Sequence, residues 1–501
     1  PPPFFQAEDG IRDIHCSLVG SEMCIRDSHY AMLHLTGYPL SLDDLRQFRQ
    51  WDSRTPGHPE VGHTPGIEVT TGPLGQGFGN GVGLALAERW LRSQFGHDLF
   101  DHHTYVVCSD GDLAEGVSHE AASFAGHQGL GRLICVYDDN HVSIDGPTEL
   151  TLSDDAVRRF EAYGWHVLDL GEAAEDLDRL EAALRDAAEV TDAPSLVVVR
   201  SHIGYPSPDF TDDPSAHGLP FDDESIRRTK EAMGLPDEPF HVPDDVAAYY
   251  AEAGRRGAER HSAWLDRLAA WTGDRDALDA CLEGRGLSGW AQKLPTWAPG
   301  ESLATRQACA KVLGSVTDVV PGLIAGSADL TGNTGMKLDG SDVLTRAEPG
   351  GRQIHYGIRE HAMGSIMNGM ALHGGVLPIG GTFLVFSDYM RPAVRLAALS
   401  GAHVIFAWSH DSVGVGEDGP THQPVEQIAS LRAIPGLRVF RPADANETAH
   451  ALQLAIDLDG PSALITSRQG LPVLGGTAEA PVDRGGYVLA HTNGACDVVL
   501  I

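Results

Sequence analysis

The sequence predicts an α/β fold made of two doubly wound blocks, each built on a parallel β-sheet. Short runs rich in β-branched residues alternate with longer runs whose apolar residues recur at helical spacing. This strand–helix–strand order implies parallel strands, because a crossover is needed to bring the chain back to the edge where the previous strand began. The alternation occurs twice in 501 residues, so two large domains are expected.

The first block is expected to cover residues 29–225. Its predicted strands are residues 104–110, 132–139, 166–170 and 195–201. Apolar residues at helical spacing predict helices at residues 114–130 and 175–190. Residues 226–298 have a helical pattern, contain tryptophans and end in the loop-like run LPTWAPGES, so we interpret them as a connector.

The second block is expected to cover residues 299–474. Its predicted strands are residues 322–328, 376–381, 403–408, 437–442 and 462–467. Its predicted helices start near residue 359 and span residues 387–399 and 446–457. Residues 475–501 predict a linker and then CDVVLI, the first strand of a third α/β domain, so we expect the chain to hold only the start of that domain.

Residues 1–28 differ from the rest of the chain. They show no sustained periodicity and lack the basic and apolar regions of a signal peptide. They resemble a translated sequencing-adapter artefact, and we leave them out of the fold prediction.

The composition indicates an acidic cytoplasmic enzyme. A net charge of −34 argues against nucleic acid as a partner, because phosphate backbones are bound by positive surfaces. No apolar run reaches the roughly 18 residues of a membrane helix, so no membrane is expected either. The seven cysteines form no CxxC pair, which favours a reducing compartment.

The run HDSVGVGEDGPTHQP, residues 410–424, concentrates ionisable side chains in a loop. It contains two histidines, two aspartates and a glutamate, and it follows the predicted strand 403–408. Open α/β sheets bind ligands at the carboxyl ends of their strands. The sequence therefore predicts a functional loop here, although a solvated turn would have a similar composition.

Two polar residues follow neighbouring predicted strands in the first block. Asp110 ends one strand and Asn140 follows the next. A carboxylate, an amide oxygen and a backbone carbonyl form an oxygen ligand set that suits Mg²⁺ or Ca²⁺. Ordinary turn chemistry explains such residues equally well when they are taken alone.

Three further stretches carry weaker indications. Residues 70–87 are a glycine-rich loop running into an apolar helix, which could bring backbone N–H groups close to a diphosphate. Glu360 is placed at the start of a helix. Phe383, Phe386 and Tyr389 recur every three residues, a stripe that predicts either core packing or an aromatic pocket.

Taken together, these stretches resemble the transketolase family of thiamine-diphosphate enzymes. The similarity covers nearly all of residues 29–474, in family order. The matching text is SRTPGHPE, EVTTGPLGQG, AEG, YDDN, EAYGW, GSADLT, YGIREHAMG, GGTF, HDSVGVGEDGPTHQP and SRQGLP. The resemblance implies a diphosphate-binding domain at residues 29–225, a pyrimidine-binding domain at residues 299–474, and a homodimer with active sites at the subunit interface.

The resemblance also implies roles for individual residues. The metal, Mg²⁺ or alternatively Ca²⁺ or Mn²⁺, would be bound by Asp110, Asn140 and Val142. Thiamine diphosphate would be contacted by Gly72, Pro73, Leu74, Gly111, Asn140, His217, Asp329, Phe383, Phe386 and Tyr389. The sugar phosphates would be bound by His58, His217, Arg306, Asn333, His410, Asp418, His422 and Arg468. Catalysis would depend on Glu360, which would hydrogen-bond the aminopyrimidine ring, and on His410 and His422.

The implied reaction moves a two-carbon ketol unit from a ketose phosphate to an aldose phosphate in the pentose phosphate pathway. The sequence departs from the family at Ser109, where glycine is usual, and in the run SADLTGNTG, where either Asn333 replaces the usual phosphate-binding serine or the register is shifted. An upstream stretch with two active-site histidines is also missing. Two alternatives remain open: a dihydroxyacetone synthase, which uses formaldehyde as the acceptor, and an inactive fragment.

Overall fold

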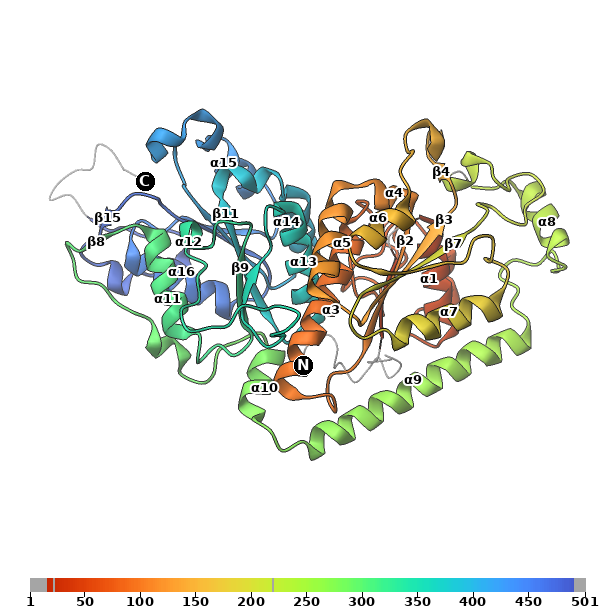
Figure 1. Cartoon of the computed structure of the whole chain (residues 1–501), viewed down its shortest axis with the longest axis horizontal. Helices are drawn as coiled ribbons and strands as arrows, with labels where there is room; N and C mark the ends of the chain where they lie inside the picture. Colours follow the sequence, from red (N-terminus) through yellow and green to blue (C-terminus); the bar gives the residue numbers. More distant parts are fainter. Residues whose placement is uncertain (1–15, 21–22, 219, 491–501) are drawn as a thin grey trace.

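The protein contains two parallel β-sheets that stand side by side, with helices between and outside them (Figure 1). The computed structural model describes residues 16–20, 23–218 and 220–490. The first sheet has the strand order β1-β2-β3-β7-β6, and every neighbouring pair is parallel. Its strands are β1 (Cys16–Gly20), β2 (His103–Ser109), β3 (Leu133–Asp139), β7 (Ser195–Arg200) and β6 (His166–Asp169).

The helices of the first domain follow the predicted alternation. They are α1 (Met23–Leu35), α2 (Leu42–Arg46), α3 (Gln76–Phe95), α4 (Asp110–Ala114), α5 (Gly116–Gln128), α6 (Ala156–Ala162) and α7 (Leu177–Glu189). β1 and the start of α1 lie in the stretch that the fold prediction left out. The strand pairs with β2 along its whole length, so the backbone there is part of the first sheet. The artefact-like origin of residues 1–28 stays a prediction.

The second sheet has six parallel strands in the order β10-β9-β11-β12-β14-β13. They are β10 (Gln353–His355), β9 (Leu323–Ser327), β11 (Leu377–Phe383), β12 (Ile405–Ser409), β14 (Ser462–Ile465) and β13 (Arg438–Phe440). All five strands predicted for this block are confirmed, and the short edge strand β10 was missed because three residues carry no readable alternation. The strand predicted for CDVVLI lies outside the described residues.

Four longer helices and several short elements complete the second domain. α11 (Thr305–Val316) and α16 (Ala445–Asp457) pack together on the outer face of the sheet, whereas α13 (Glu360–His373) and α14 (Arg391–Ser400) cover the inner face. The short elements are β8 (Ser302–Leu303), α12 (Thr331–Thr334), α15 (Gln427–Arg432) and β15 (Leu471–Pro472). β8 and β15 pair antiparallel, which joins the beginning and the end of this domain.

Glycines allow the two domains to approach closely through α3 and α13. A Cβ atom on Gly83 of α3 would lie 2.0 Å from the backbone oxygen of Ile366, and one on Gly369 of α13 would lie 2.0 Å from the backbone oxygen of Asn80. This corrects the prediction for residues 70–87. The helix begins at Gln76, so most of the glycines belong to a buried helix rather than to a loop. Gly79 and Gly83 face α13, and Gly81 faces Val106 of β2.

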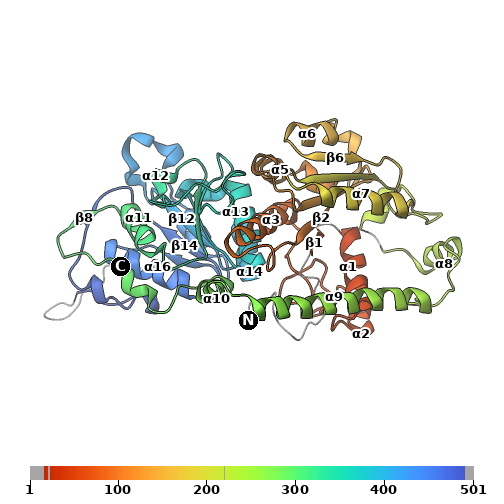
Figure 2. The same ribbon diagram turned by 60° about the horizontal axis from the view of Figure 1, so that its bottom comes forward.

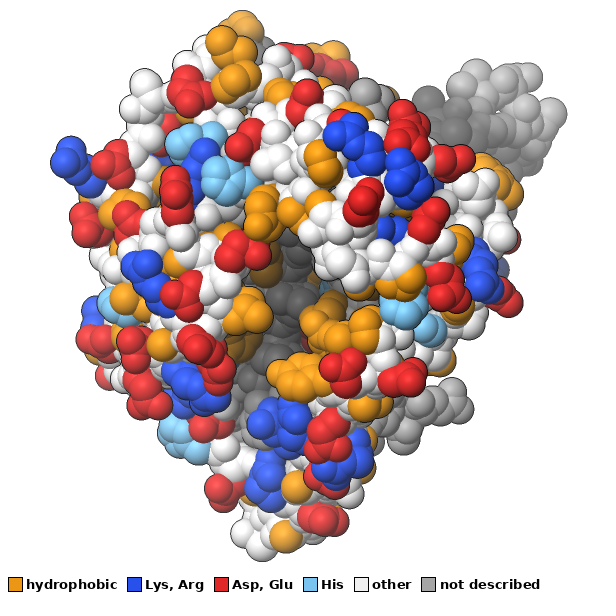
Figure 3. Space-filling model, turned by 90° about the vertical axis from the view of Figure 1, so that its right-hand side faces the viewer, with side chains coloured by type: hydrophobic (Ala, Val, Ile, Leu, Met, Phe, Trp, Pro, Cys, Tyr) orange, Lys and Arg blue, Asp and Glu red, His pale blue; other side chains and the backbone are white. Residues whose placement is uncertain are grey.

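The connector is helical, as predicted, and runs beneath the first domain (Figure 2). It contains α8 (Asp223–Ala232), α9 (Asp244–Ala270) and α10 (Arg275–Leu282). Trp264 of α9 is buried and donates a hydrogen bond from Nε1 to the backbone oxygen of Leu99 at 2.9 Å, which fixes the helix to the first domain. On the face drawn in Figure 3, acidic and basic side chains are interspersed. Of the helices in the described ranges, none has the length and apolar character needed to span a membrane.

Candidate active site

Asp110 and Asn140 come together at the carboxyl ends of β2 and β3. Tyr137 donates a hydrogen bond from its hydroxyl to Asp110 Oδ1 at 2.7 Å, and the backbone N–H of His141 donates to Asp110 Oδ2 at 3.1 Å. His141 has a left-handed φ of 57°. Asn140 Oδ1 accepts a hydrogen bond from the N–H of Val142 at 3.1 Å. The three residues predicted as metal ligands therefore meet in one turn.

The electrostatics of this turn fit a cation. Burial raises the pKa of Asp110, and the hydrogen bond from Tyr137 opposes that rise. The nearby carboxylate of Asp139 raises the pKa further. A divalent cation would compensate the buried charge, and carboxylate and amide oxygens are the ligands that Mg²⁺ prefers. The described residues contain no group of three His, Cys, Asp or Glu side chains arranged for a metal, so any ion here would depend on amide and backbone oxygens.

The predicted diphosphate turn, Gly72 to Leu74, lies directly before α3. Gly72 has a φ of 132°, and a Cβ atom there would lie 3.0 Å from Cγ of His58, so this histidine packs against the turn. Gly111 is the second residue of α4. His217 ends the short 3₁₀ helix Pro214–His217, which packs against β4 (Val142–Ser143) and so stands beside the metal turn.

Aromatic rings and histidines form a second group at the carboxyl ends of β11 and β12. The ring centroids of Phe383 and His410 are 3.8 Å apart, and those of Phe386 and His422 are 5.2 Å apart. Phe386 also contacts Tyr389, at 5.9 Å. The helix Leu384–Asp388 is a 3₁₀ helix with three residues per turn, so side chains three residues apart lie on one side. The stripe therefore places three aromatic rings on one side, with Phe383 against His410 and Phe386 against His422.

His410 is buried beside two arginines. Burial, together with the charges of Arg306 and Arg468, lowers its pKa to about 4, although Asp418 opposes the change. The imidazole is therefore neutral at pH 7, and Nδ1 lies 2.9 Å from Ser409 Oγ.

Backbone carbonyls hold both arginines, and Arg468 also forms an ion pair with Glu417. Arg306 donates from Nη1 to the backbone oxygen of Asn333 at 2.8 Å, and Arg468 donates from Nη1 to the backbone oxygen of Val415 at 3.1 Å. Within the described residues, the buried Nε of Arg306 has no hydrogen-bond partner. Burial and the charge of Arg468 lower the pKa of Arg306. An anion between the guanidinium groups would relieve both effects.

Glu360 starts α13, as predicted, and accepts a hydrogen bond on Oε1 from Thr382 Oγ1 at 3.3 Å. A second carboxylate, which the sequence analysis missed, lies near it. Glu120 of α5 accepts a hydrogen bond on Oε2 from the backbone N–H of Ala362 at 2.9 Å. Burial raises the pKa of Glu120, and the carboxylate of Glu360 raises it further. No motif marked Glu120, because only the packing of α5 against α13 brings it there.

The remaining predicted residues are exposed. Asp329 follows β9 with a left-handed φ of 62°, and its side chain is exposed. Tyr389 is 65% exposed and Leu74 is 37% exposed. Asn333 is also exposed and contributes its backbone oxygen to Arg306 and to Ser409 Oγ. The predicted residues thus form two groups, one in each domain. The first group lies around the carboxyl ends of β2 and β3 and contains His58, Gly72, Pro73, Leu74, Asp110, Gly111, Asn140, Val142 and His217. The second group lies around the carboxyl ends of the strands of the second sheet and contains Arg306, Asp329, Asn333, Glu360, Phe383, Phe386, Tyr389, His410, Asp418, His422 and Arg468.

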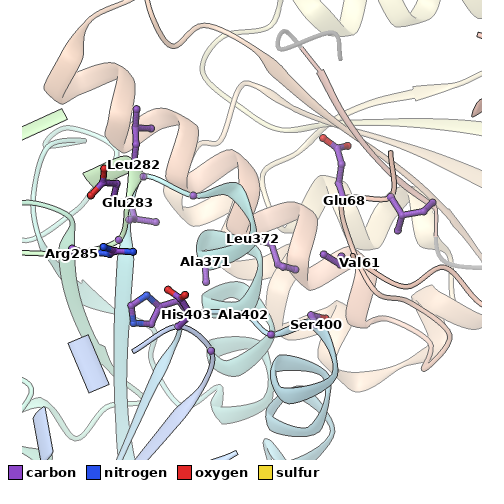
Figure 4. A pocket seen from close by; sticks show the side chains of 18 residues that line it. Val61, Glu68, Leu282, Glu283, Arg285, Ala371, Leu372, Ser400, Ala402 and His403 are labelled. Atoms are coloured by element: carbon purple, nitrogen blue, oxygen red, sulfur yellow. The ribbon is translucent and has the colours of Figure 1, made fainter. Parts of the chain in front are cut away.

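Two cavities are found among the described residues, and only one of them adjoins a predicted site residue. One of about 440 Å³ is lined by residues such as Leu282, Arg285, Leu372 and His403 (Figure 4). It sits where α10, α13 and α14 end and where β11 and β12 begin, at the edge opposite the two groups. None of the predicted residues lines it. A second cavity, of about 330 Å³, is lined by Asp110, Tyr137 and His141 and therefore adjoins the metal turn.

Comparisons with known proteins agree with this arrangement. Residues 21–288 match the family described as transketolase, thiamine diphosphate binding domain, and residues 301–473 match transketolase, pyrimidine binding domain. The chain is 47% identical to a transketolase of Halalkalibacterium halodurans, over 94% of this chain and 72% of that protein. It is 46% identical to a transketolase of Mycobacterium tuberculosis, over 94% of this chain and 71% of the relative.

Solved structures give the same result. A transketolase of Pichia stipitis in complex with sedoheptulose 7-phosphate superimposes with a TM-score of 0.94 at 41% identity, covering 97% of this chain and 74% of the other. A transketolase of Campylobacter jejuni superimposes with a TM-score of 0.90 at 37% identity, covering 97% and 75%. From its two domains and its relatives, the chain belongs to the transketolase family, with a thiamine-diphosphate-binding first domain and a pyrimidine-binding second domain.

Proposed function

We propose that this protein transfers a two-carbon ketol unit from a ketose phosphate to an aldose phosphate, as in the pentose phosphate pathway. The observation that carries the proposal is the second group, in which a neutral, buried His410 stands between the Phe383 ring and two arginines. Related structures support sugar phosphates as substrates, since transketolases of Pichia stipitis have been solved in complex with xylulose 5-phosphate and with sedoheptulose 7-phosphate.

The first group would hold the diphosphate end of the cofactor. Asp110, Asn140 and the carbonyl of Val142 would bind Mg²⁺, with Ca²⁺ or Mn²⁺ as substitutes, and the turn from Gly72 to Leu74 would approach the phosphates. The buried charge of Asp110 supports this assignment. In the second group, Phe383, Phe386 and Tyr389 would contact the aromatic ring of the cofactor, and Glu360 would hydrogen-bond it.

Thiamine diphosphate, when bound, supplies the nucleophilic carbon that cleavage of a ketose needs. The residues of the chain would orient the sugar and move its protons. His410 would accept a hydrogen bond from a sugar hydroxyl, because a neutral imidazole has a free lone pair. Arg306 and Arg468 would bind the sugar phosphate. A bound phosphate would offset their charge and raise the pKa of His410, which would make that histidine a better base.

We infer that the two groups act together through a homodimer. Each group belongs to its own domain, and residues beside the second group are exposed. Ile358 is 78% exposed and Tyr389 is 65% exposed. Large apolar side chains exposed beside functional residues favour an interface, so the first domain of one subunit would complete the second group of its partner.

The direct test is an assay of the purified chain with Mg²⁺, thiamine diphosphate, xylulose 5-phosphate and ribose 5-phosphate. We expect formation of sedoheptulose 7-phosphate that depends on both the cofactor and the cation. Replacing ribose 5-phosphate by formaldehyde tests the dihydroxyacetone synthase alternative, and faster turnover with formaldehyde would favour it. Absence of turnover together with absence of cofactor binding would favour an inactive fragment.

A further inference from the structure

A fully buried carboxylate, Asp112, connects the predicted diphosphate turn to the end of β2, next to the predicted metal ligand Asp110. Its Oδ1 accepts a hydrogen bond from the backbone N–H of Gly75 at 2.8 Å, and its Oδ2 accepts one from the backbone N–H of Ser109 at 3.2 Å. Gly75 closes the predicted diphosphate turn, and Ser109 directly precedes the predicted metal ligand Asp110. The Asp112 side chain therefore joins Gly75 and Ser109, which lie 34 residues apart in the sequence.

The diphosphate turn is also seated on the start of α5. Gly75 has a left-handed φ of 74°, and a Cβ atom there would lie 2.7 Å from a methyl of Val117 and 2.8 Å from Ser118 Oγ. Ser118 in turn donates a hydrogen bond to the backbone oxygen of Asp112 at 2.6 Å. The turn cannot move away from α4 and α5 unless these contacts break.

A buried carboxylate requires hydrogen bonds, and those that it accepts are stronger than those between neutral groups. Loss of either N–H partner would leave an uncompensated charge in the core. The distance between the turn and the end of β2 is therefore fixed by Asp112 in the absence of any ligand.

We propose that Asp112 is a positioning residue for cofactor binding: it presets the separation between the diphosphate turn and the metal ligand Asp110. This inference rests on the proposed function. A divalent cation bound to a protein commonly bridges its carboxylate ligand to the phosphates of a cofactor. Preset spacing lets the cation and the diphosphate bind together without the cost of ordering two loops, so each should strengthen the binding of the other.

The test compares Asp112→Asn with a matched control, Asp444→Asn. Asp444 is equally buried, and it too accepts two backbone hydrogen bonds, from Glu447 at 3.0 Å and Leu474 at 2.9 Å, but it caps α16 in the second domain. Titration calorimetry would measure the dissociation constant of thiamine diphosphate for the 501-residue chain, with and without Mg²⁺. Thermal melting would measure the stability of both variants.

We expect Asp112→Asn to raise the dissociation constant of thiamine diphosphate at least tenfold in saturating Mg²⁺ and to reduce the strengthening caused by Mg²⁺. Asp444→Asn should lower the melting temperature to a similar degree and leave the dissociation constant within twofold. Equal affinity in Asp112→Asn and wild type would overturn the inference, as would an equal loss in Asp444→Asn. Failure of the wild-type chain to bind thiamine diphosphate would instead refute the proposed function, and this inference with it.

Amide hydrogen exchange in the wild-type chain provides a second measurement that does not depend on any variant folding. The amides of Gly75 and Ser109 should exchange slowly before any ligand is added, because Asp112 already binds them. Little further slowing is expected when Mg²⁺ and thiamine diphosphate are added. If the Gly75 amide exchanged as fast as that of the exposed Leu74 until the ligands bound, the spacing would not be preset and the inference would be wrong.

Discussion

Burial, more than neighbouring charge, sets the ionisation of three residues of the candidate site. It is the largest cause of the lowered pKa of His410 and of the raised pKa values of Asp110 and Glu120. A ligand of opposite charge compensates such groups, because it favours the form that burial disfavours. Binding of the substrate, the cation or the cofactor would therefore change the ionisation of these residues most.

Replacement of Glu360 by glutamine should lower turnover by more than tenfold while thiamine diphosphate still binds. The carboxylate stands at the start of α13, and the amide cannot hold a proton in the same way. The measurements are steady-state kinetics and calorimetry on the same preparation. A tenfold loss corresponds to about 1.4 kcal/mol of barrier, and a smaller loss would mean that the role of Glu360 is misassigned.

Replacement of Asp110 by alanine should abolish the dependence of cofactor binding on Mg²⁺. Asp110 supplies the only charge among the three proposed ligands, so the ion would lose its main attraction. Calorimetry at several Mg²⁺ concentrations would measure the effect. A variant whose cofactor affinity still rose with Mg²⁺ as in the wild type would disprove the metal assignment.

Replacement of Arg306 or Arg468 by alanine should raise the KM for phosphorylated sugars at least tenfold more than for unphosphorylated sugars. Each guanidinium lies near His410. Arg306 has a buried Nε without a partner among the described residues, whereas Arg468 is paired with Glu417, which a sugar phosphate would replace as its anionic partner. Arg441→Ala is a suitable control, because Arg441 belongs to the same domain and, like Arg468, pairs with a carboxylate, that of Asp411 at 2.9 Å, but is not a predicted sugar-phosphate ligand. Equal effects on both classes of sugar would show that the two arginines are structural.

Helix α3 carries a buried acid whose ionisation opposes folding. Glu88 is fully buried, and burial raises its pKa to about 7, although Arg92 opposes the rise with an ion pair at 3.0 Å. Because the folded state binds this proton more tightly than the unfolded chain, the stabilisation is complete below about pH 4.5 and is lost as the pH rises through 7. The effect is at most on the order of 3 kcal/mol.

Glu88→Gln should therefore gain stability relative to wild type as the pH rises from 5 to 8. The measurement is denaturant unfolding at several pH values, and the quantity to compare is the difference in free energy of unfolding between the two proteins. Glu181→Gln on α7 is the control, because Glu181 forms an exposed pair with Arg185 in the same i to i+4 arrangement. A difference that stayed constant with pH for Glu88→Gln would contradict the raised pKa.

At the scale of the whole molecule, the contact between α3 and α13 is what makes two α/β domains into one body. Gly83→Ala would place a methyl group 2.0 Å from the backbone oxygen of Ile366, so one helix must move. We expect a loss of about 1–3 kcal/mol and separate melting of the two domains in calorimetry.

Gly314→Ala in α11 is the matched control for this prediction. A Cβ atom there has no described neighbour within 4 Å, so alanine should stabilise the helix by roughly 0.5–1 kcal/mol. A single unchanged melting transition for Gly83→Ala would show that the domains are held together by other contacts.

The sequence was sufficient to predict the helices and strands that have a clear apolar periodicity, and the site residues that lie within one motif. The strands ending at Ser109 and Asp139 were predicted because alternating apolar residues carry a local signature. The pairing of Asp110 with Asn140 followed from the rule that parallel strands end at one edge. The helix start at Glu360 followed from the local run YGIREHAMG. The glycines of α3 were placed in a loop, and only the close approach of α13 to Gly79 and Gly83 and of β2 to Gly81 explains them in a helix.

By itself, the sequence determined the α/β class, the order of the elements, and the family through motifs that stay contiguous along the chain. Only the tertiary structure decided which distant groups meet: Glu120 with α13, Asp112 with Gly75, and Arg306 with His410. The physical reason is that periodicity and turn chemistry act between neighbours in sequence. Burial and hydrogen bonding act between neighbours in space, and these set the pKa values and the spacing on which a binding site depends.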